Sequence, residues 1–274
     1  MHDMPSEENS DQPKISIGLV VYNGAKHIRI ALDSIVRQPY RNIELIIVDG
    51  DSKDGTQNIL SEYADHISML VSEPDKGIYD AMNKVCSLAT GDWLLFLGCD
   101  DVLLDTLCNM APLMTDSDSV YYGDVINRSS GNIYGGEFSK YRLMHQNICH
   151  QGLFYPRVAY KKYSYNLNYK WLADHAHNLK LFGDGVPFVY TGVVVSLFND
   201  MGVSSRGDAD FSREQIKLIR ASFGNMYALV EILRSRKIIY FMHKPVHVIA
   251  VVLKCLLPYP YWKYLQSLWR SYLK

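Results

Sequence analysis

The chain has 274 residues, of which 48% are hydrophobic and 21% are charged, enough for one large α/β domain or one domain with an appendage. The formal net charge of -1 argues against wholesale nucleic-acid binding. The five cysteines are scattered, with neither a CxxC pair nor a zinc-ligand spacing, which is typical of a reducing compartment.

Three regions differ in composition. Residues 1–12 are acidic and polar, so we expect a disordered segment and not a signal peptide. Residues 13–210 carry the strand and helix patterns of an α/β domain with two halves, 13–125 and 126–210. Residues 211–274 are rich in cations and aromatic side chains, and we expect them to be helical.

The first half alternates between apolar runs and amphipathic segments. Such alternation predicts βαβ units, right-handed crossovers and a Rossmann-like, mostly parallel sheet with helices on both faces. The expected strands are 14–21, 43–48 and 67–71, and a fourth within 93–101.

The last of these strands ends in two adjacent carboxylates, Asp100 and Asp101. Its apolar residues do not alternate with polar ones, which indicates a strand covered on both faces. Open α/β sheets bind ligands at the carboxyl ends of their strands, and paired carboxylates suit Mg²⁺ or Mn²⁺. We therefore predict that Asp100 and Asp101 hold a metal, and that the metal holds a phosphate. The alternative is that Asp101 caps a helix over 102–114 and Asp100 is a solvated turn residue.

The second half has weaker periodicity. We expect a strand at 119–125, a hairpin near 129–132, and an extended piece at 148–154. A helix over 169–179 would place Asp174 and His175 at or near its start. One or two strands fall in 186–198, before a loop rich in glycine and serine at 199–210.

The tail combines many cations with an apolar run at 246–257 and an aromatic cluster at 259–262. This mixture suits a helix that lies in a bilayer interface. The alternative is a helical cap packed on the main domain.

Four segments carry polar and glycine-containing motifs in sequence order: 20–23 (VVYN), 47–56 (IVDGDSKDGT), 72–84 (SEPDKGIYDAMNK) and 96–101 (FLGCDD). Together they resemble the motifs of inverting family 2 glycosyltransferases, which have the glycosyltransferase-A fold. The form of the third is similar to that in bacterial exopolysaccharide and O-antigen transferases, including colanic acid biosynthesis glycosyltransferases.

The resemblance implies a nucleotide-sugar donor, with a UDP-sugar as the first expectation. Asp49 would accept a hydrogen bond from an N–H of the nucleotide base. The alternative is that Asp49 accepts hydrogen bonds from the backbone of its own turn. Asp80 and Asn83 would bind ribose or donor-sugar hydroxyls, with a solvated helix face as the alternative. Lys76 would offer its charge to the diphosphate, with a plain surface lysine as the alternative. The implied donor-binding residues are Val21, Tyr22, Asn23, Asp49, Asp51, Asp75, Lys76, Asp80, Asn83, Cys99 and Asp100.

The implied reaction is a single displacement in which an acceptor hydroxyl attacks the anomeric carbon. Mn²⁺ or Mg²⁺ on Asp100 and Asp101 would neutralise the leaving diphosphate. Asp174 matches the position of the family's general base, with a buried structural Asp as the alternative. His150 and Gln151 resemble an "HQ" element of related bacterial transferases, and we expect them to contact the diphosphate or the acceptor. The alternative is that His150 is a core histidine whose hydrogen bonds are made within the protein.

Two positions depart from the family pattern. Gly98 stands where an Asp or Asn is usual in the metal motif, and Ala173 stands where many relatives carry Glu. Gly98 keeps open a non-catalytic sugar-nucleotide-binding or scaffold protein. A nucleotidyltransferase is a further alternative, because such enzymes also use Asp-bound metal at the end of a strand.

The expected partners are the nucleotide sugar and a glycan or lipid-linked oligosaccharide acceptor, and not a nucleic acid. The basic, aromatic tail predicts peripheral association with the inner face of the cytoplasmic membrane. Whether the protein forms a homodimer is left open.

Overall fold

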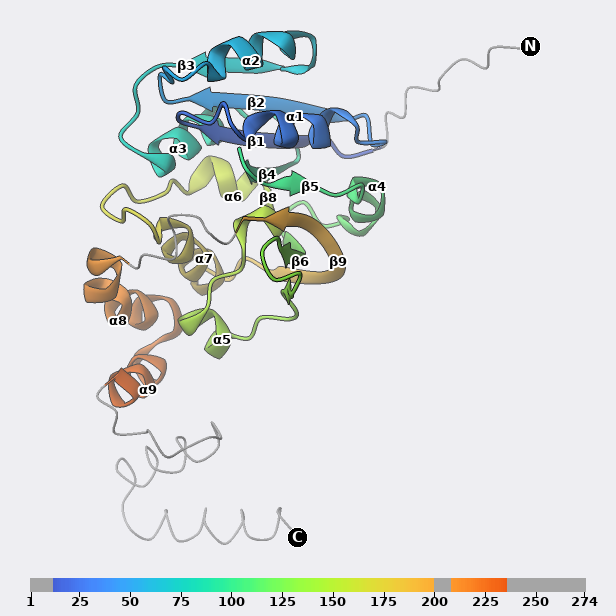
Figure 1. Ribbon diagram of the computed structural model, residues 1–274. Helices are drawn as coiled ribbons and strands as arrows, with labels where there is room; N and C mark the ends of the chain where they lie inside the picture. The colour runs from blue at the N-terminus through green and yellow to red at the C-terminus, as the bar shows by residue number, and fades with distance from the viewer. Residues whose placement is uncertain (1–11, 200–207, 236–274) are drawn as a thin grey trace, which may run out of the picture. The chain divides into compact units, whose positions relative to one another are not determined.

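The computed structural model describes residues 12–199 and 208–235 (Figure 1). The expectations for residues 1–11 and for the apolar and aromatic tail beyond 235 lie outside the described residues. Within the described ranges, no helix combines the length and the apolar character that crossing a membrane requires.

Four parallel strands form the first half of the sheet, in the order β3-β2-β1-β4. The register pairs Val21 with Asp49 and Val20 with Gly98, so the strands end along one edge. These strands are β1 (Ile15–Val21), β2 (Ile43–Asp49), β3 (Met69–Ser72) and β4 (Trp93–Gly98), as the βαβ pattern predicts.

Helices cover both faces of this parallel part. The apolar side of α1 (Ile28–Val36) and Leu60 of α2 (Thr56–Glu62) join the core that includes Ile17 and Leu19 of β1. On the other face, Val85 of α3 (Ile78–Leu88) packs over Gly18. A short 3₁₀ helix, η1 (Ala64–His66), precedes β3.

The second half of the sheet is mixed. Strand β8 (Leu153–Pro156) lies antiparallel between β4 and β6 (Val120–Asn127), and β6 pairs in parallel with β9 (Phe188–Phe198). The full order is β3-β2-β1-β4-β8-β6-β9-β5, where β5 spans Val102–Leu103. Strand β7 (Ile133–Tyr134) forms the expected hairpin with β6. The helices between β7 and β9 are α5 (Lys140–His145), η3 (His150–Gly152), α6 (Arg157–Lys162) and α7 (Ala173–Gly183).

One expected helix is wrong. The segment 102–114 begins with β5 (Val102–Leu103), which pairs antiparallel with Leu197 and Ser196 of β9. Only α4 (Leu107–Met110) and η2 (Ala111–Leu113) are helical there. Pairing with a strand far along the chain overrides the local helical pattern. Asp101 is therefore not the N-cap of a helix.

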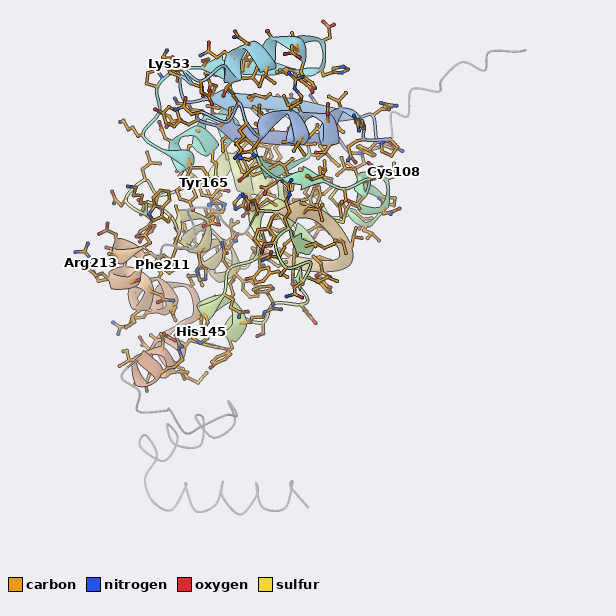
Figure 2. All side chains as sticks on the ribbon, in the orientation of Figure 1. Lys53, Cys108, His145, Tyr165, Phe211 and Arg213 are labelled. Carbon is orange, nitrogen blue, oxygen red and sulfur yellow. The ribbon has the colours of Figure 1, made fainter. Side chains whose placement is uncertain are left out.

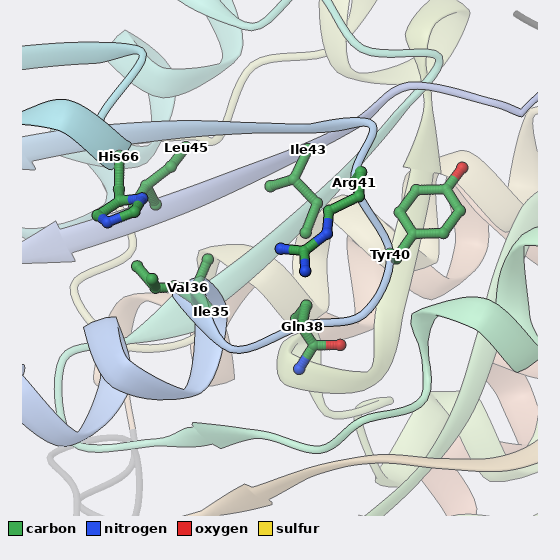
Figure 3. A pocket seen from close by; sticks show the side chains of 8 residues that line it. All are labelled: Ile35, Val36, Gln38, Tyr40, Arg41, Ile43, Leu45 and His66. Atoms are coloured by element: carbon green, nitrogen blue, oxygen red, sulfur yellow. The ribbon is translucent and has the colours of Figure 1, made fainter. Parts of the chain in front are cut away.

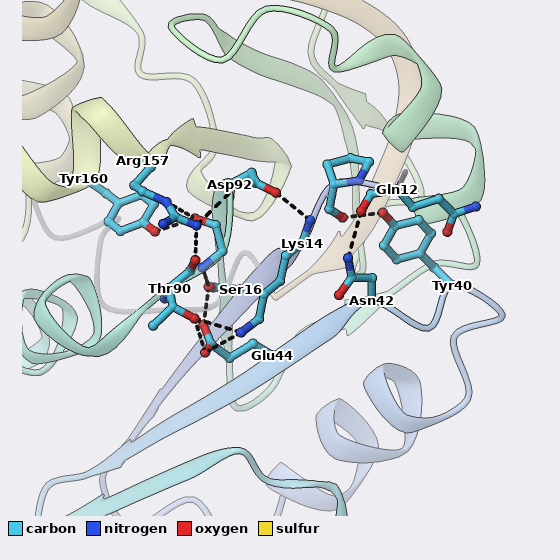
Figure 4. Close-up of polar contacts among 12 residues, drawn as sticks. Gln12, Lys14, Ser16, Tyr40, Asn42, Glu44, Thr90, Asp92, Arg157 and Tyr160 are labelled. Carbon is cyan, nitrogen blue, oxygen red and sulfur yellow. Dashed lines mark hydrogen bonds and ion pairs between the residues drawn. The ribbon is translucent and has the colours of Figure 1, made fainter. Parts of the chain in front are cut away.

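The amino ends of the strands carry a polar cluster that Figure 4 shows. The buried carboxylate of Glu44 accepts hydrogen bonds from Ser16 Oγ at 2.6 Å, Thr90 Oγ1 at 2.7 Å and Lys14 Nζ at 3.0 Å. Its pKa falls to about 2, because these bonds, together with one from the Thr90 N–H, outweigh the opposing effect of burial. The cluster ties β1, β2 and the turn before β4 together.

A small hollow of about 140 Å³ lies near the start of β2, lined by Gln38, Tyr40, Arg41 and neighbours from α1 (Figure 3). Pockets that hold small molecules usually measure about 300–1,000 Å³. This hollow is also at the end of β2 opposite to its carboxyl terminus, so it is not the candidate site.

The described part of the chain divides into two compact units, with the boundary between Ser222 and Phe223. Helix α8 (Ala209–Phe223) lies almost wholly in the first unit, where the Phe211 ring (Figure 2) stacks on His175 with centroids 5.0 Å apart. Helix α9 (Asn225–Ser235) belongs to the second unit. Both helices agree with the expected helical character after residue 211, whereas the domain boundary at residue 210 stays a prediction.

Candidate active site

The loops after β1 and β2 are tied together at the carboxyl edge of the sheet. The Asn23 N–H donates to Ser52 Oγ at 2.7 Å, and Asn23 Oδ1 accepts from the Lys53 N–H at 3.0 Å. Asn23 and Asp51 have positive φ angles of 51° and 65°, which short polar side chains tolerate better than other non-glycine residues. The Asp51 carboxylate pairs with the Lys53 ammonium. Both loops are therefore held in defined conformations.

Tyr22, Gly50 and Asp75 meet where β1, β2 and β3 end. A Cβ atom at Gly50 would lie 2.6 Å from Asp75 Oδ2 and 3.3 Å from Tyr22 Cδ2, so glycine gives these side chains room. Tyr22 is 67% exposed although it follows the buried Val21. An exposed ring beside a carboxylate offers stacking to a base and an acceptor to ribose hydroxyls.

Asp49 is fully buried and surrounded by donors. Its carboxylate accepts hydrogen bonds from the Ser52 N–H and hydroxyl, from Ser72 Oγ at 2.7 Å, and from Gln57 Nε2 at 3.2 Å. A nucleotide base would have to replace one of these donors to bond with Asp49. The contact of Asp49 with the base stays a prediction.

The loop before α3 is organised by two carboxylates. Asp75 Oδ1 accepts from the Gly77 N–H at 2.8 Å, and Asp80 Oδ2 accepts from the Lys76 N–H at 3.0 Å. Asp80 also lies 3.9 Å from Lys84 Nζ. The Lys76 side chain is exposed. Asp75 and Asp80 thus both hold the backbone of the loop.

Asn83 lies one turn after Asp80 but contacts a different segment. Its Nδ2 donates to the Tyr165 carbonyl at 3.0 Å, and its Oδ1 accepts from the Tyr165 N–H at 2.8 Å. This two-point bond fastens α3 to the segment before α7. Sugar binding by Asp80 and Asn83 stays a prediction.

The carboxylate of Asp101 is buried and engaged on both oxygens. Asp101 Oδ2 accepts from the Gly98 N–H at 2.9 Å and from Gln151 Nε2 at 2.8 Å, and Oδ1 accepts from the Asn199 N–H at 2.9 Å. Burial raises its pKa, and the charge of Asp100 adds to this, although the hydrogen bonds from Asn199 and Gln151 oppose it. These contacts fit a residue that fixes the turn after β4.

The same turn explains why the metal motif begins with glycine. A Cβ atom at Gly98 would lie 2.5 Å from Asp101 Oδ2. Because three donors hold the Asp101 carboxylate, it cannot move aside cheaply. An Asp or Asn at position 98 therefore does not fit this turn.

Asp100 is the more accessible carboxylate of the pair. Its Oδ2 accepts from Asn199 Nδ2 at 2.7 Å, and its backbone carbonyl accepts from Arg128 at 3.3 Å. Within the described ranges its Oδ1 has no hydrogen-bond partner, whereas both oxygens of Asp101 are engaged. The neighbouring Cys99 thiol is neutral, since burial and the two carboxylates raise its pKa to about 12.

A divalent cation fits this arrangement when a diphosphate accompanies it. No three His, Cys, Asp or Glu side chains gather as a metal site in the described residues. Mg²⁺ is usually held by one or two carboxylates together with water and substrate phosphates. Asp100 would hold the cation, and the cation would neutralise charge on the departing diphosphate.

Asp174 is the second residue of α7 and is 8% exposed. Its Oδ1 accepts from Tyr79 Oη and from the His175 N–H, both at 2.9 Å. Its Oδ2 accepts from Asn147 Nδ2 at 2.8 Å and lies 3.5 Å from His150 Nδ1. The carboxylate that the sequence singles out is therefore the centre of a polar network.

The protonation of Asp174 and His150 is coupled. Burial by itself would raise the pKa of Asp174, but the hydrogen bond and charge of His150, aided by Tyr79, hold it below its ordinary value. Burial would likewise lower the pKa of His150, but Asp174 holds it above its ordinary value. Each group thus favours the charged form of the other.

Sequence reasoning did not assign roles to Tyr79, Asn147 and Asn199. Tyr79 lies inside the segment 72–84, and Asn147 lies three residues before His150, so proximity to a motif was the available signal for both. Asn199 follows β9 in a loop without periodicity, and its sequence context gives no signal. Its two bonds to the Asp100–Asp101 pair appear only in the fold.

Comparison with known proteins identifies the family. The family model described as "Glycosyl transferase family 2" matches residues 16–178, which is more than half of the chain. This chain belongs to glycosyl transferase family 2. The match includes β1 except for its first residue, β2 to β4, the Asp100–Asp101 turn and Asp174.

Curated relatives agree with the assignment. The family 2 glycosyltransferase is 40% identical over 200 residues to a "PGL/p-HBAD biosynthesis glycosyltransferase" of Mycobacterium tuberculosis, a match that covers 69% of this chain and 78% of that protein. An "Uncharacterized glycosyltransferase" of Rickettsia typhi is 30% identical over 173 residues, covering 57% of this chain and 54% of its own length.

Solved structures show that the fold is the glycosyltransferase-A fold. TarS of S. aureus in complex with UDP has a TM-score of 0.65 and 20% identity, covering 84% of this chain and 72% of TarS. The mannosyltransferase PcManGT of Pyrobaculum calidifontis, in complex with GDP-Man and Mn²⁺, has a TM-score of 0.57 and 18% identity over 93% of this chain and 84% of its own. The predicted α/β architecture is confirmed.

Proposed function

We propose that this glycosyltransferase moves a sugar from a nucleoside-diphosphate donor to an acceptor hydroxyl with inversion at the anomeric carbon. The observation that carries the proposal is the position of two adjacent residues in η3. Gln151 contacts Asp101 in the metal motif, and His150 contacts Asp174. One short segment therefore links the group that would anchor the diphosphate to the group that would receive the acceptor's proton.

The donor half of the proposal rests on the carboxyl edge of the parallel strands. Tyr22, Gly50 and Asp75 provide a place for the nucleoside, and Asp100 would hold Mn²⁺ or Mg²⁺ against the diphosphate. Fold neighbours were solved with UDP, UDP-GlcNAc and GDP-Man, which supports this class of donor without selecting the base. A UDP-sugar remains our first choice.

Inversion follows from a single displacement. The acceptor oxygen attacks the anomeric carbon from the face opposite the diphosphate, and the C–O bond to the diphosphate breaks. Asp174 and His150 supply one acid–base centre for the proton that leaves the hydroxyl. An α-linked nucleotide sugar would give a β-linked product.

A glycan or lipid-linked acceptor in bacterial surface polysaccharide synthesis is the acceptor that we propose. The curated relative's name places it in PGL/p-HBAD biosynthesis, which supports a glycoconjugate pathway. Peripheral attachment to the membrane through the basic, aromatic tail belongs to the same proposal and rests on composition. Flotation with liposomes would test it, with a chain ending at residue 235 as the comparison.

The decisive experiment is a screen of nucleotide sugars with Mn²⁺ and a glycan or lipid-linked acceptor, with release of the nucleoside diphosphate as the readout. We expect turnover with one donor class and loss of turnover on adding EDTA. Release of pyrophosphate from a nucleoside triphosphate would instead indicate a nucleotidyltransferase. Binding without any turnover would indicate a scaffold protein.

A further inference from the structure

Asn147 lies beside α7 and bridges two residues of that helix. Its Nδ2 donates to Asp174 Oδ2 at 2.8 Å, and its Oδ1 accepts from Asn178 Nδ2 at 2.8 Å. Asp174 and Asn178 lie one helical turn apart, so they share one face of α7. One amide therefore connects the carboxylate that would act as the base to the next turn of the helix that carries it.

The orientation of the Asn147 amide is set by a chain of hydrogen bonds. Asn178 is fully buried, and its Oδ1 accepts from Tyr155 Oη of β8 at 2.9 Å. Asn178 therefore presents its Nδ2 to Asn147, and Asn147 in turn presents its own Nδ2 to Asp174. The three bonds run in one direction from Tyr155 to Asp174, and bonds in such a chain polarise and strengthen one another.

The backbone of Asn147 is held as well. Its carbonyl accepts a hydrogen bond from Tyr134 Oη of β7, and the next residue, Ile148, is buried. The side chain of Asn147 consequently has a fixed starting point as well as a fixed amide orientation. It can hold a partner in place instead of following that partner's motion.

Asp174 Oδ2 accepts this one hydrogen bond within the described part of the chain. A carboxylate oxygen offers about two acceptor positions, and His150 Nδ1, at 3.5 Å, lies at ion-pair distance. A position thus remains on Oδ2 for a substrate hydroxyl, which a general base must have within hydrogen-bond reach. A donor on each oxygen, with the His175 N–H on Oδ1, keeps the carboxylate from pivoting.

We propose that Asn147 is the positioning residue of the general base: its amide holds Asp174 Oδ2 in the orientation that receives the proton of the acceptor hydroxyl. Asn147 acts through Asp174 and does not itself take a proton. This inference rests on the proposed function and names the group that orients its base.

The step that Asn147 would assist balances as follows. The acceptor O–H bond breaks and its proton passes to Asp174 Oδ2, while the acceptor oxygen forms a bond with the anomeric carbon. The bond between that carbon and the diphosphate oxygen breaks, and its electron pair stays on the nucleoside diphosphate. Asp174 later returns its proton to water.

Asn147 favours the right charge as well as the right orientation. A donor to a carboxylate stabilises its charged form, and the charged form is the one that can accept a proton. An amide also brings no charge of its own to the base, whereas an acid at the same place would repel the Asp174 carboxylate. Asn147→Ser and Asn147→Asp therefore disturb the base in two different ways, because the first loosens it and the second opposes its charge.

The first test reads the chain of bonds directly and needs no substrate. The full chain is labelled with ¹⁵N-asparagine, and the side-chain amide signals of Asn147 are assigned by their loss in Asn147→Ser. We expect these protons to exchange with solvent about tenfold or more slowly than those of the exposed Asn168, and to lose that protection in Asn178→Ala. Exchange as fast as that of Asn168 in the unmodified chain would overturn the proposal.

The second test uses turnover of UDP-GlcNAc and GDP-mannose with Mn²⁺. Asn147→Ser should lower kcat about 10- to 100-fold and leave the KM for the donor unchanged, because a misplaced base slows the chemical step. Asn147→Asp should move the acidic limb of the pH–rate profile to higher pH, since a second carboxylate raises the pKa of Asp174. A kcat for Asn147→Ser within about threefold of the unmodified chain, or an unmoved limb in Asn147→Asp, would overturn the proposal.

The matched control is a buried amide away from the site. Gln38 Nε2 donates to the carbonyls of Ser34 and Leu104, both at 3.0 Å. Gln38→Leu should lose stability, but its kcat and its pH–rate profile should not change. The same loss of kcat in Gln38→Leu would show that the effect of Asn147→Ser is general destabilisation, which would also overturn the proposal.

Failure of the proposed function has a separate signature. If the unmodified chain does not bind UDP in the presence of Mn²⁺, the donor site is wrong whatever the Asn147 amide shows. If UDP binds and a donor is turned over, but Asn147→Ser keeps its kcat, the proposed function stands and only the role of Asn147 is wrong.

Discussion

Gln151 donates a hydrogen bond of 2.8 Å to Asp101, a residue 50 positions earlier in the chain. The other end of its amide accepts from the Cys149 thiol, so the orientation of the amide is fixed. Because His150 is the next residue, this bond also sets the position of the imidazole relative to the turn after β4. The donor and acceptor sides of the site are therefore not independent.

Gln151→Leu tests this coupling. The variant leaves one acceptor position of the buried Asp101 carboxylate unsatisfied, which costs about 1–3 kcal/mol. We expect a lower free energy of unfolding in urea and weaker Mn²⁺-dependent binding of UDP. Gln146→Leu, at an exposed position on the same segment, is the control. Unchanged stability in Gln151→Leu would show that the bond contributes nothing.

Gly98 provides a second prediction, which is the opposite of what the usual metal motif of the family would suggest. Restoring the usual acid with Gly98→Asp should weaken metal-dependent UDP binding, because the new Cβ would meet Asp101 Oδ2. Gly98→Ala should lower stability for the same reason, by about 1–3 kcal/mol. In an Asp101→Ala background the Gly98→Ala change should cost much less, since the clash is gone. Tighter UDP binding by Gly98→Asp would contradict this account of the turn.

Tyr79→Phe should change the pH dependence of turnover. Its hydroxyl donates to Asp174 and helps to hold the Asp174 pKa low, so its removal raises that pKa. The acidic limb of the pH–rate profile should therefore move to higher pH. Tyr160→Phe loses a comparable buried bond, to the Gly91 carbonyl, away from the site. Tyr160→Phe should also lose stability, but its pH–rate profile should not move. An equal shift of the acidic limb in both variants would refute the explanation.

Glu44 should make the fold sensitive to acid. Its pKa of about 2 in the folded protein lies below the ordinary value of 4.5, so its contribution is present above about pH 4.5 and is lost as the pH falls towards 2. Glu44→Gln should cost about 1–3 kcal/mol at pH 7 and less at pH 3, where part of the Glu44 contribution is already lost. Urea unfolding of both proteins at pH 7 and pH 3 measures this. An equal difference at both values would contradict the assigned pKa.

The sequence predicts the parallel part of the fold well because that part is local. Each of β1, β2 and β4 is a mainly apolar run, with Ser16 in β1 and Glu44 in β2 as polar exceptions near the start, and each run is followed by a polar turn. The pairing of β5 with β9 joins residues far apart in the chain, and no local pattern encodes it. For this reason a helix was expected where Val102 and Leu103 form a strand.

The candidate site, too, could be predicted from the sequence only in part. Asp100, Asp101 and Asp174 stand next to motifs, and their residue types alone suggest chemistry. What each carboxylate contacts depends on the fold: Asp101 is enclosed by three donors, whereas Asp100 keeps one oxygen without a partner in the described residues. Asn199, which touches both, comes from the end of β9 and could not be found from spacing.

The most direct test of the account is calorimetric titration of UDP into the full chain with and without Mn²⁺. We expect binding that strengthens at least tenfold with Mn²⁺, equivalent to about 1.4 kcal/mol, and loses that gain in Asp100→Asn, while the variant's stability stays unchanged. UDP binding that is equally strong in EDTA, or a full Mn²⁺ effect in Asp100→Asn, would contradict the claim that Asp100 holds a cation on the diphosphate.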